Sequence, residues 1–87
     1  MIFRKLKVRV LQKRLRFLEE DIQDVGKEIA DINETLHPSN SLTQEQTLAV
    51  LRERSFLHTR LELLQNRMHH TRIRLEKEQD GQRRKEQ

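Results

Sequence analysis

The chain has 87 residues, of which 37% are charged and 33% hydrophobic, and it carries a net charge of +4. So few apolar residues cannot form a thick globular core, because small domains bury proportionally little of their surface. The absence of cysteine excludes disulfide bonds and thiolate metal sites.

The first predicted element is a helix over residues 3–36. From Val8 to Leu36, apolar residues follow one another at alternating steps of three and four, which is the spacing of a coiled-coil seam. The seam residues are Val8, Leu11, Leu15, Leu18, Ile22, Val25, Ile29, Ile32 and Leu36. Such a long, narrow stripe needs a second helix to cover it.

A turn is predicted over residues 37–42, because Pro38 disfavours helical geometry in the residue before it. Thr43 with Gln46 matches a capping box for a second helix over residues 43–78, and Ser41 with Gln44 offers a second register for it. A second, less regular seam follows: Thr47, Val50, Arg54, Leu57, Leu61, Leu64, Met68, Thr71 and Leu75. The polar residues 80–87 predict a flexible tail.

The two seams together predict an all-α fold, an antiparallel two-helix coiled-coil hairpin over residues 1–79. A tight connection sets the expected layers: Ile29 on Val50, Val25 on Arg54, Ile22 on Leu57, Leu18 on Leu61, Leu15 on Leu64 and Leu11 on Met68. Arms of about 35 residues would give a rod of roughly 50 Å.

One expected layer is unusual, because it places Arg54 opposite Val25 and beside Gly26. Gly26 would then make room for the Arg54 stem while the guanidinium reaches Asp24 or Glu28. In the alternative interpretation, Gly26 marks a bend or a close approach by a partner.

Charge is segregated along the predicted rod. Residues 17–37 hold seven acids and one base, whereas residues 1–16 and 63–75 hold ten Lys and Arg residues and no acid. Such a dense block of like charge favours an anionic partner. The candidate partner-binding residues of this basic end are Arg4, Lys5, Lys7, Arg9, Lys13, Arg14, Arg16, Arg67, Arg72 and Arg74.

Some apolar residues lie outside both seams. Phe3, Val10 and Phe17 share one heptad position on the first helix, and Ala49, Phe56 and Leu63 share one on the second. A two-helix hairpin has no further layer to cover them. We therefore expect Phe3, Val10, Phe17, Phe56 and Leu63 to form an apolar stripe for homo-oligomerisation or docking, although isolated exposed apolar residues are common.

The sequence contains no recognisable catalytic or cofactor motif. His69 and His70 are adjacent and so point to different sides of a helix, which does not suit a metal pair. We expect no enzymatic activity, no metal and no cofactor. The longest apolar run, residues 48–51, is far short of the roughly 20 residues that span a bilayer, and we expect a soluble, cytoplasmic protein.

Several segments resemble the central-stalk proteins of type III secretion systems, namely the injectisome SpaM/InvI and YscO type and their flagellar relative FliJ. The segments are LKV at 6–8, LQKR at 11–14, LTQE at 42–45, LRERSFL at 51–57 and RLEL at 60–63. The resemblance implies an antiparallel coiled coil without a catalytic site. It also implies docking at the centre of a hexameric secretion ATPase and contact with the export gate at the inner membrane.

Two other interpretations remain open. The basic end could neutralise nucleic-acid phosphates, with two hairpins forming a four-helix bundle. No aromatic residue interleaves the basic run for base stacking, which weakens this alternative. The start of the chain, Met1 to Phe3, could instead lie on anionic lipid together with the bases that follow it.

Overall fold

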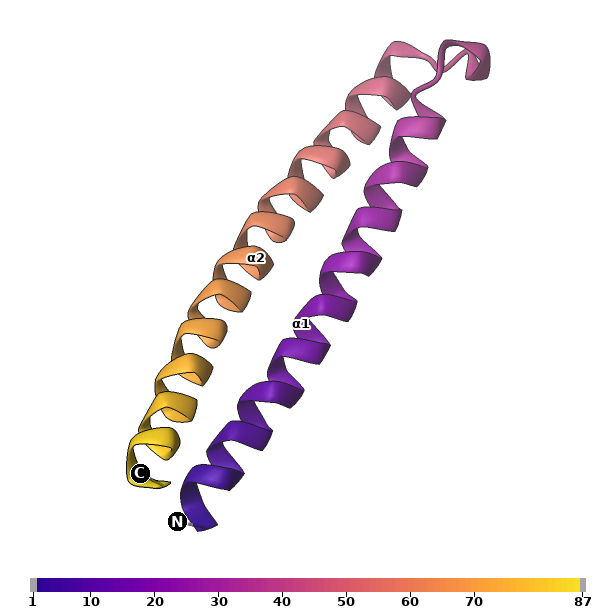
Figure 1. The fold of residues 1–87 in the computed structure, drawn as a ribbon. Coiled ribbons are helices and arrows are strands. Elements are labelled where there is room, and N and C mark those ends of the chain that lie inside the picture. The colour runs from indigo at the N-terminus through magenta and orange to yellow at the C-terminus, as the bar shows by residue number, and fades with distance from the viewer. Residues whose placement is uncertain (1, 87) are drawn as a thin grey trace.

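The computed structural model describes the backbone of residues 2–86 and the side chains of residues 3–81. Helix α1 (Ile2–Thr35) is followed by a 3-10 turn, η1 (Pro38–Asn40), and by helix α2 (Gln44–Glu86). The two helices run side by side in opposite directions, so that both chain ends lie at the same end of the rod (Figure 1). The predicted all-α hairpin is thereby confirmed.

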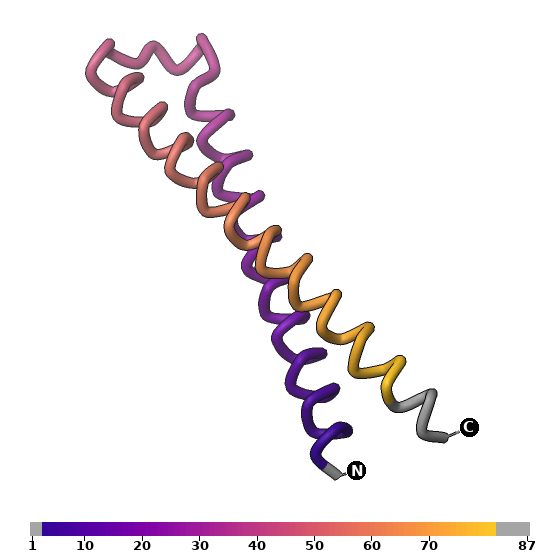
Figure 2. Tube along the Cα trace, turned by 90° about the vertical axis from the view of Figure 1, so that its left-hand side faces the viewer, coloured from indigo at the N-terminus to yellow at the C-terminus, as the bar shows by residue number. Residues whose placement is uncertain are grey.

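The rod is longer than the roughly 50 Å expected from two 35-residue arms. Its principal extents are 65 × 16 × 14 Å, and α2 alone contains 43 residues. Viewed after a quarter turn, the helices cross near their middle and diverge towards both ends (Figure 2). This gentle crossing is the geometry expected of a heptad seam.

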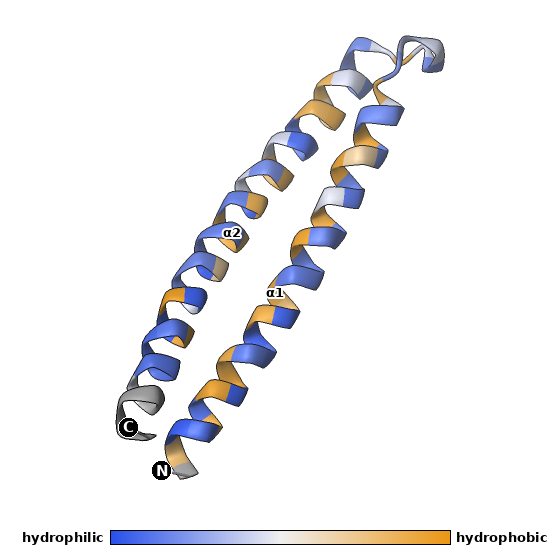
Figure 3. Cartoon of the chain, in the orientation of Figure 1, coloured by the Kyte–Doolittle hydropathy of each residue, from blue (hydrophilic) through white to orange (hydrophobic). Residues whose placement is uncertain are grey.

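The core is a single row of side chains between the helices. Val25 is 2% exposed and Leu57 6%, and they form one cluster with Ile29 and Leu64. Every residue of the two predicted seams is buried or half-buried. The apolar residues alternate with polar ones along both helices (Figure 3), which is how an amphipathic helix covers one stripe and solvates the rest.

The register differs from the expected layers by about one heptad. Arg54 Nη1 donates to Asn33 Oδ1 at 3.1 Å, well beyond the expected partner Val25. The Arg72 guanidinium lies 3.9 Å from the Glu19 carboxylate. In the expected register, Arg72 would lie about 18 Å further along the rod from Glu19 at 1.5 Å per residue, which is too far for these two side chains to span.

The connection explains this shift. Figure 1 shows the first turn of α2 level with the connecting segment rather than with the last turn of α1. Because both seams repeat every seven residues, sliding one helix by a heptad keeps seam on seam. It also moves Arg54 away from Val25 and towards the turn. The most buried residue, Val25, therefore has no arginine opposite it, which avoids burying a positive charge.

Gly26 and Arg54 do not interact as expected. A Cβ added at Gly26 would have no neighbour within 4 Å, and Arg54 bonds to Asn33 rather than to Asp24 or Glu28. The prediction that Gly26 makes room for the Arg54 stem is therefore wrong. Its cause is the register, which places Arg54 about one heptad from Gly26.

Hydrogen bonds fix the connection at both helix ends. The Asn40 side-chain amide donates to the carbonyl oxygens of Glu34, at 2.8 Å, and Thr35, at 3.1 Å, where α1 ends. Ser41 then adopts a left-handed conformation, with φ at 49°. The backbone N–H of Gln46 donates to Thr43 Oγ1 at 3.1 Å, and that of Thr43 to Gln46 Oε1 at 3.0 Å, which is the predicted capping box.

Replacing Thr43 by alanine is expected to lower the free energy of unfolding by about 1 kcal/mol, because the N–H of Gln46 loses its acceptor at the start of α2. Urea denaturation followed by far-UV circular dichroism measures the loss. Replacing Gln44, the exposed neighbour in the first turn, by alanine is the matched control. Equal losses in the two variants would show that the cap does not stabilise the helix.

Helix α2 does not end at Glu78 as expected, since it continues through residues 80–86; Gln87 lies outside the described residues. The prediction of a tail from residue 80 gave too much weight to Gly81, which costs only about 1 kcal/mol in a helix of otherwise good helix formers. Gly81 has a partner instead, because its carbonyl oxygen accepts from Arg4 Nη1 at 3.0 Å. A Cβ at this position would lie 3.1 Å from the same nitrogen.

Candidate interaction surfaces

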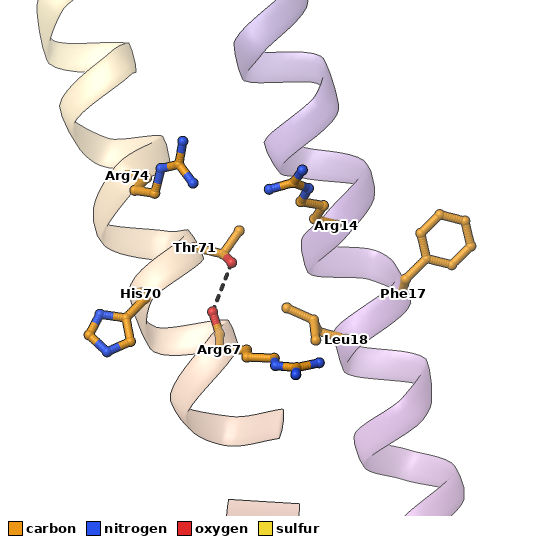
Figure 4. A pocket seen from close by; sticks show the side chains of 7 residues that line it. All are labelled: Arg14, Phe17, Leu18, Arg67, His70, Thr71 and Arg74. Carbon is orange, nitrogen blue, oxygen red and sulfur yellow. Dashed lines mark hydrogen bonds between the residues drawn. The ribbon is translucent and has the colours of Figure 1, made fainter. Parts of the chain in front are cut away.

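Three arginine side chains from the two helices converge on one groove. Arg14 of α1 and Arg67 and Arg74 of α2 line a space of about 470 Å³. The other lining residues are Phe17, Leu18, His70 and Thr71. In Figure 4 the guanidinium groups of Arg14 and Arg74 point towards each other across the gap, and that of Arg67 points towards α1. We call this space the arginine groove.

The arginine groove is suited to an anion. All three arginines are exposed, and the described residues include no ion pair to any of them within 4.0 Å. Three guanidinium groups around an open space raise the local positive potential, and their planar forks match carboxylate or phosphate oxygens. Phe17, which is 64% exposed, adds an apolar neighbour.

A second groove, of about 270 Å³, lies next to it towards the open end of the rod. Phe3, Leu6, Val10 and Leu11 supply its apolar lining, and Glu78 supplies an acid. Lys7, Arg14 and Arg74 complete the lining. Leu6 was not among the predicted stripe residues, although its spacing of three from Phe3 and four from Val10 is the signal that could have found it.

The predicted basic residues do not all remain available. Arg4 is half-buried and donates to the Gly81 carbonyl, and Arg72 lies beside Glu19 with about half of each side chain exposed. At that exposure and distance the ion pair contributes little to stability. The exposed remainder of the basic set consists of Lys5, Lys7, Arg9, Lys13, Arg14, Arg16, Arg67 and Arg74.

The open end also contains acids, contrary to the prediction of an acid-free basic end. The one-heptad shift carries Glu76, Glu78 and Asp80 alongside the first turns of α1, and Glu78 shares a groove with Lys7. This end keeps a net positive charge, because residues 1–16 contain seven bases and no acid.

The two predicted apolar stripes lie on the same flank of the hairpin. Phe17 and His70 line the arginine groove together. Phe3 and Val10 precede Phe17 by two heptads and one, and Phe56 and Leu63 precede His70 in the same way. Residues that differ by whole heptads share a face of the helix, so the α1 stripe lies on the face of Phe17 and the α2 stripe on the face of His70. Phe3 is 80% exposed, Phe56 73%, and Val10 and Leu63 about half. We call this face the groove flank.

No family model, curated protein or solved structure matches the chain. Within residues 2–86, neither helix contains an apolar window long enough to cross a membrane. The part of the chain that the structure describes also brings no three His, Asp or Glu side chains together as metal ligands. His69 and His70 contact only edge to face, with ring centroids 5.7 Å apart.

Proposed function

We propose that the chain is a non-catalytic coiled-coil stalk or adaptor of a type III protein secretion apparatus, docking in the secretion ATPase ring and linking it to the export gate. The observation that carries the proposal is the shape of the molecule: a bare two-helix rod, 65 Å long and about 15 Å wide. A rod of this kind acts through its surface. The resemblance of residues 42–63 to central-stalk proteins supports the choice of partner.

The distribution of charge suggests an orientation for the rod. Bases dominate the open end, and residues 17–37, which lead towards the turn, are predominantly acidic. With opposite charges at its two ends, the rod can bind an acidic partner at the open end and a basic partner at the turn end. In this proposal the open end enters the ATPase ring and the turn end faces the export gate.

Reversing the charge of the exposed bases Lys5, Lys7, Arg9 and Lys13 to glutamate is expected to weaken binding to the secretion ATPase of the same organism by at least about tenfold, because the attraction to an acidic partner becomes repulsion. Calorimetry and ATPase stimulation measure the effect. The matched control reverses four acids of the turn half, Asp24, Glu28, Asp31 and Glu34, to lysine, which should leave ATPase binding intact. If the first variant binds as the unmodified chain does, the proposed orientation is wrong.

Nucleic-acid binding is the second candidate, and the arginine groove is the observation that favours it. Arg14, Arg67 and Arg74 could contact phosphates while the exposed Phe17 stacks on a base. This function predicts that labelled RNA binds with an affinity that falls steeply as salt rises. Absence of RNA binding at low ionic strength removes the candidate.

A further inference from the structure

The groove flank has two halves of opposite charge. Asp21 and Glu28 follow Arg14 by one heptad and two, and Asp24 and Asp31 follow Phe17 in the same way. Residues that differ by whole heptads share a face of the helix, so these four exposed acids continue the flank towards the turn. On α2, Arg60 and Glu53 precede Arg67 by one heptad and two, and their opposite charges offset each other in the turn half. The open half of the flank is therefore basic and the turn half has a net acidic charge.

Apolar residues on this flank also change helix between the two halves. In the open half Phe3, Val10 and Phe17 lie on α1, opposite the arginines of α2. In the turn half Leu63 and Phe56 lie on α2, opposite the acids of α1. Each half thus combines an apolar row on one helix with a charged row on the other.

We propose that the groove flank binds a second copy of this chain in antiparallel orientation, forming a four-helix bundle in which each arginine groove receives Asp21, Asp24 and Glu28 of the other copy. A two-fold axis across the rod near its middle brings the open half of each copy against the turn half of the other. This axis packs each helix on the same helix of the other copy. Asp21 and Glu28, which share the heptad position of Arg14, then face the groove of the other copy and lie diagonally across from the arginines of its α2. Asp24 and Asp31, which share the heptad position of Phe17, lie over the apolar row of the other α1.

The parallel alternative is disfavoured by the same charges. A two-fold axis along the rod would place open half on open half, and the two arginine grooves would face each other without an anion between them. Like charges brought together in this way cost free energy and suppress the arrangement.

The size of the flank is sufficient for a stable pair. A face of 65 by 16 Å offers on the order of 1,000 Å² per copy, against about 800 Å² per partner in a standard interface. Its exposed apolar residues, Phe17 and Phe56 foremost, are the aromatic anchors that interfaces favour. Pairs of hairpins that cover such faces form four-helix bundles.

The oligomeric state of the purified chain tests the pairing. Sedimentation equilibrium at low ionic strength and high micromolar concentration should give twice the chain mass of 10.6 kDa, and added salt should weaken the association, because salt screens the attraction between the two charged halves. A monomer throughout the concentration series would overturn the proposal. This experiment involves no other protein, so its outcome is independent of the proposed secretion role.

Charge exchange tests the matching of the two halves. A variant with Arg14, Arg67 and Arg74 changed to glutamate, and another with Asp21, Asp24 and Glu28 changed to arginine, should each dimerise at least about tenfold more weakly. Because all six side chains are exposed, the hairpins should keep their helicity, and circular dichroism checks this. Mixing the two variants, or combining all six changes in one chain, should restore the dimer. Unchanged dimerisation of both triple variants would contradict the proposal.

Crosslinking tests the orientation, since the chain contains no cysteine of its own. In the antiparallel dimer Val10→Cys should link to Asp31→Cys of the other copy when the two single variants are mixed, and neither should link to itself. Arg9→Cys with Ala30→Cys, each one residue earlier and on the opposite flank, is the matched control and should not link. A link between two copies of the Val10→Cys variant would show a parallel dimer and overturn the arrangement.

Discussion

Replacing Leu57 by alanine is expected to lower the free energy of unfolding by about 2–5 kcal/mol, the range for truncating a buried leucine. Leu57 is 6% exposed and lies in the cluster with Val25, Ile29 and Leu64. A domain of this size has a total stability of about 5–15 kcal/mol, and a single row of side chains offers no second layer that could fill the cavity. Urea denaturation followed by helicity measures the loss.

Leu48→Ala is the matched control for this experiment. Leu48 lies on the same helix but is 50% exposed, so the same change of side chain removes little buried surface. We expect a loss below about 1 kcal/mol. Similar losses in the two variants would mean that Leu57 does not lie in the core.

The one-heptad shift in register predicts an all-or-none crosslinking result. Glu19→Cys and Arg72→Cys in one chain should be joined by a short bis-maleimide, since these side chains approach to 3.9 Å. Glu19→Cys with His58→Cys should not be joined, because position 58 lies about nine residues from the level of Glu19, or about 13 Å along the rod. The product is identified by mass spectrometry of the peptides from the monomeric fraction.

His58 is an informative control because it shares the heptad position of Arg72. It therefore lies on the same flank of α2, and only its place along the rod differs. In the register with Ile22 on Leu57 and Leu18 on Leu61, position 58 would lie only about 3 Å from Glu19 along the rod. A result in which the 19–58 pair reacts and the 19–72 pair does not would establish that register instead.

The local features of the fold were predictable from the sequence. The three-four spacing marks which residues of each helix are covered, and the Thr43–Gln46 capping box marks where α2 begins. Both signals depend on residues that are close in the sequence. They specify an element and its buried face without reference to the rest of the molecule.

The register could not be predicted in the same way. Two heptad seams match equally well after a slide of seven residues, so the apolar pattern is compatible with several registers of α1 against α2. Choosing among them depends on the path of residues 36–43, where the Asn40 side chain and the left-handed Ser41 carry the chain past the end of α1. The end of α2 was missed for a related reason, because the partner of Gly81 is Arg4, at the other end of the sequence.

The sequence predicted the positive charge of the candidate site but not the arrangement of its side chains. Sequence reasoning assigned Arg14, Arg67 and Arg74 to a basic end, together with seven other bases. It could not show that these three line one groove beside Phe17. Their convergence is a consequence of the register, and the same is true of the acids that lie alongside the first turns of α1.

The bond from Arg4 to the Gly81 carbonyl, 3.0 Å long, holds the beginning of α1 against the last turns of α2. A segment whose entry and exit are adjacent can be spliced into a surface loop of an unrelated host without pulling that loop apart. The hairpin could then serve as a rigid lever, projecting about 65 Å from its host and carrying a reporter or epitope at its tip.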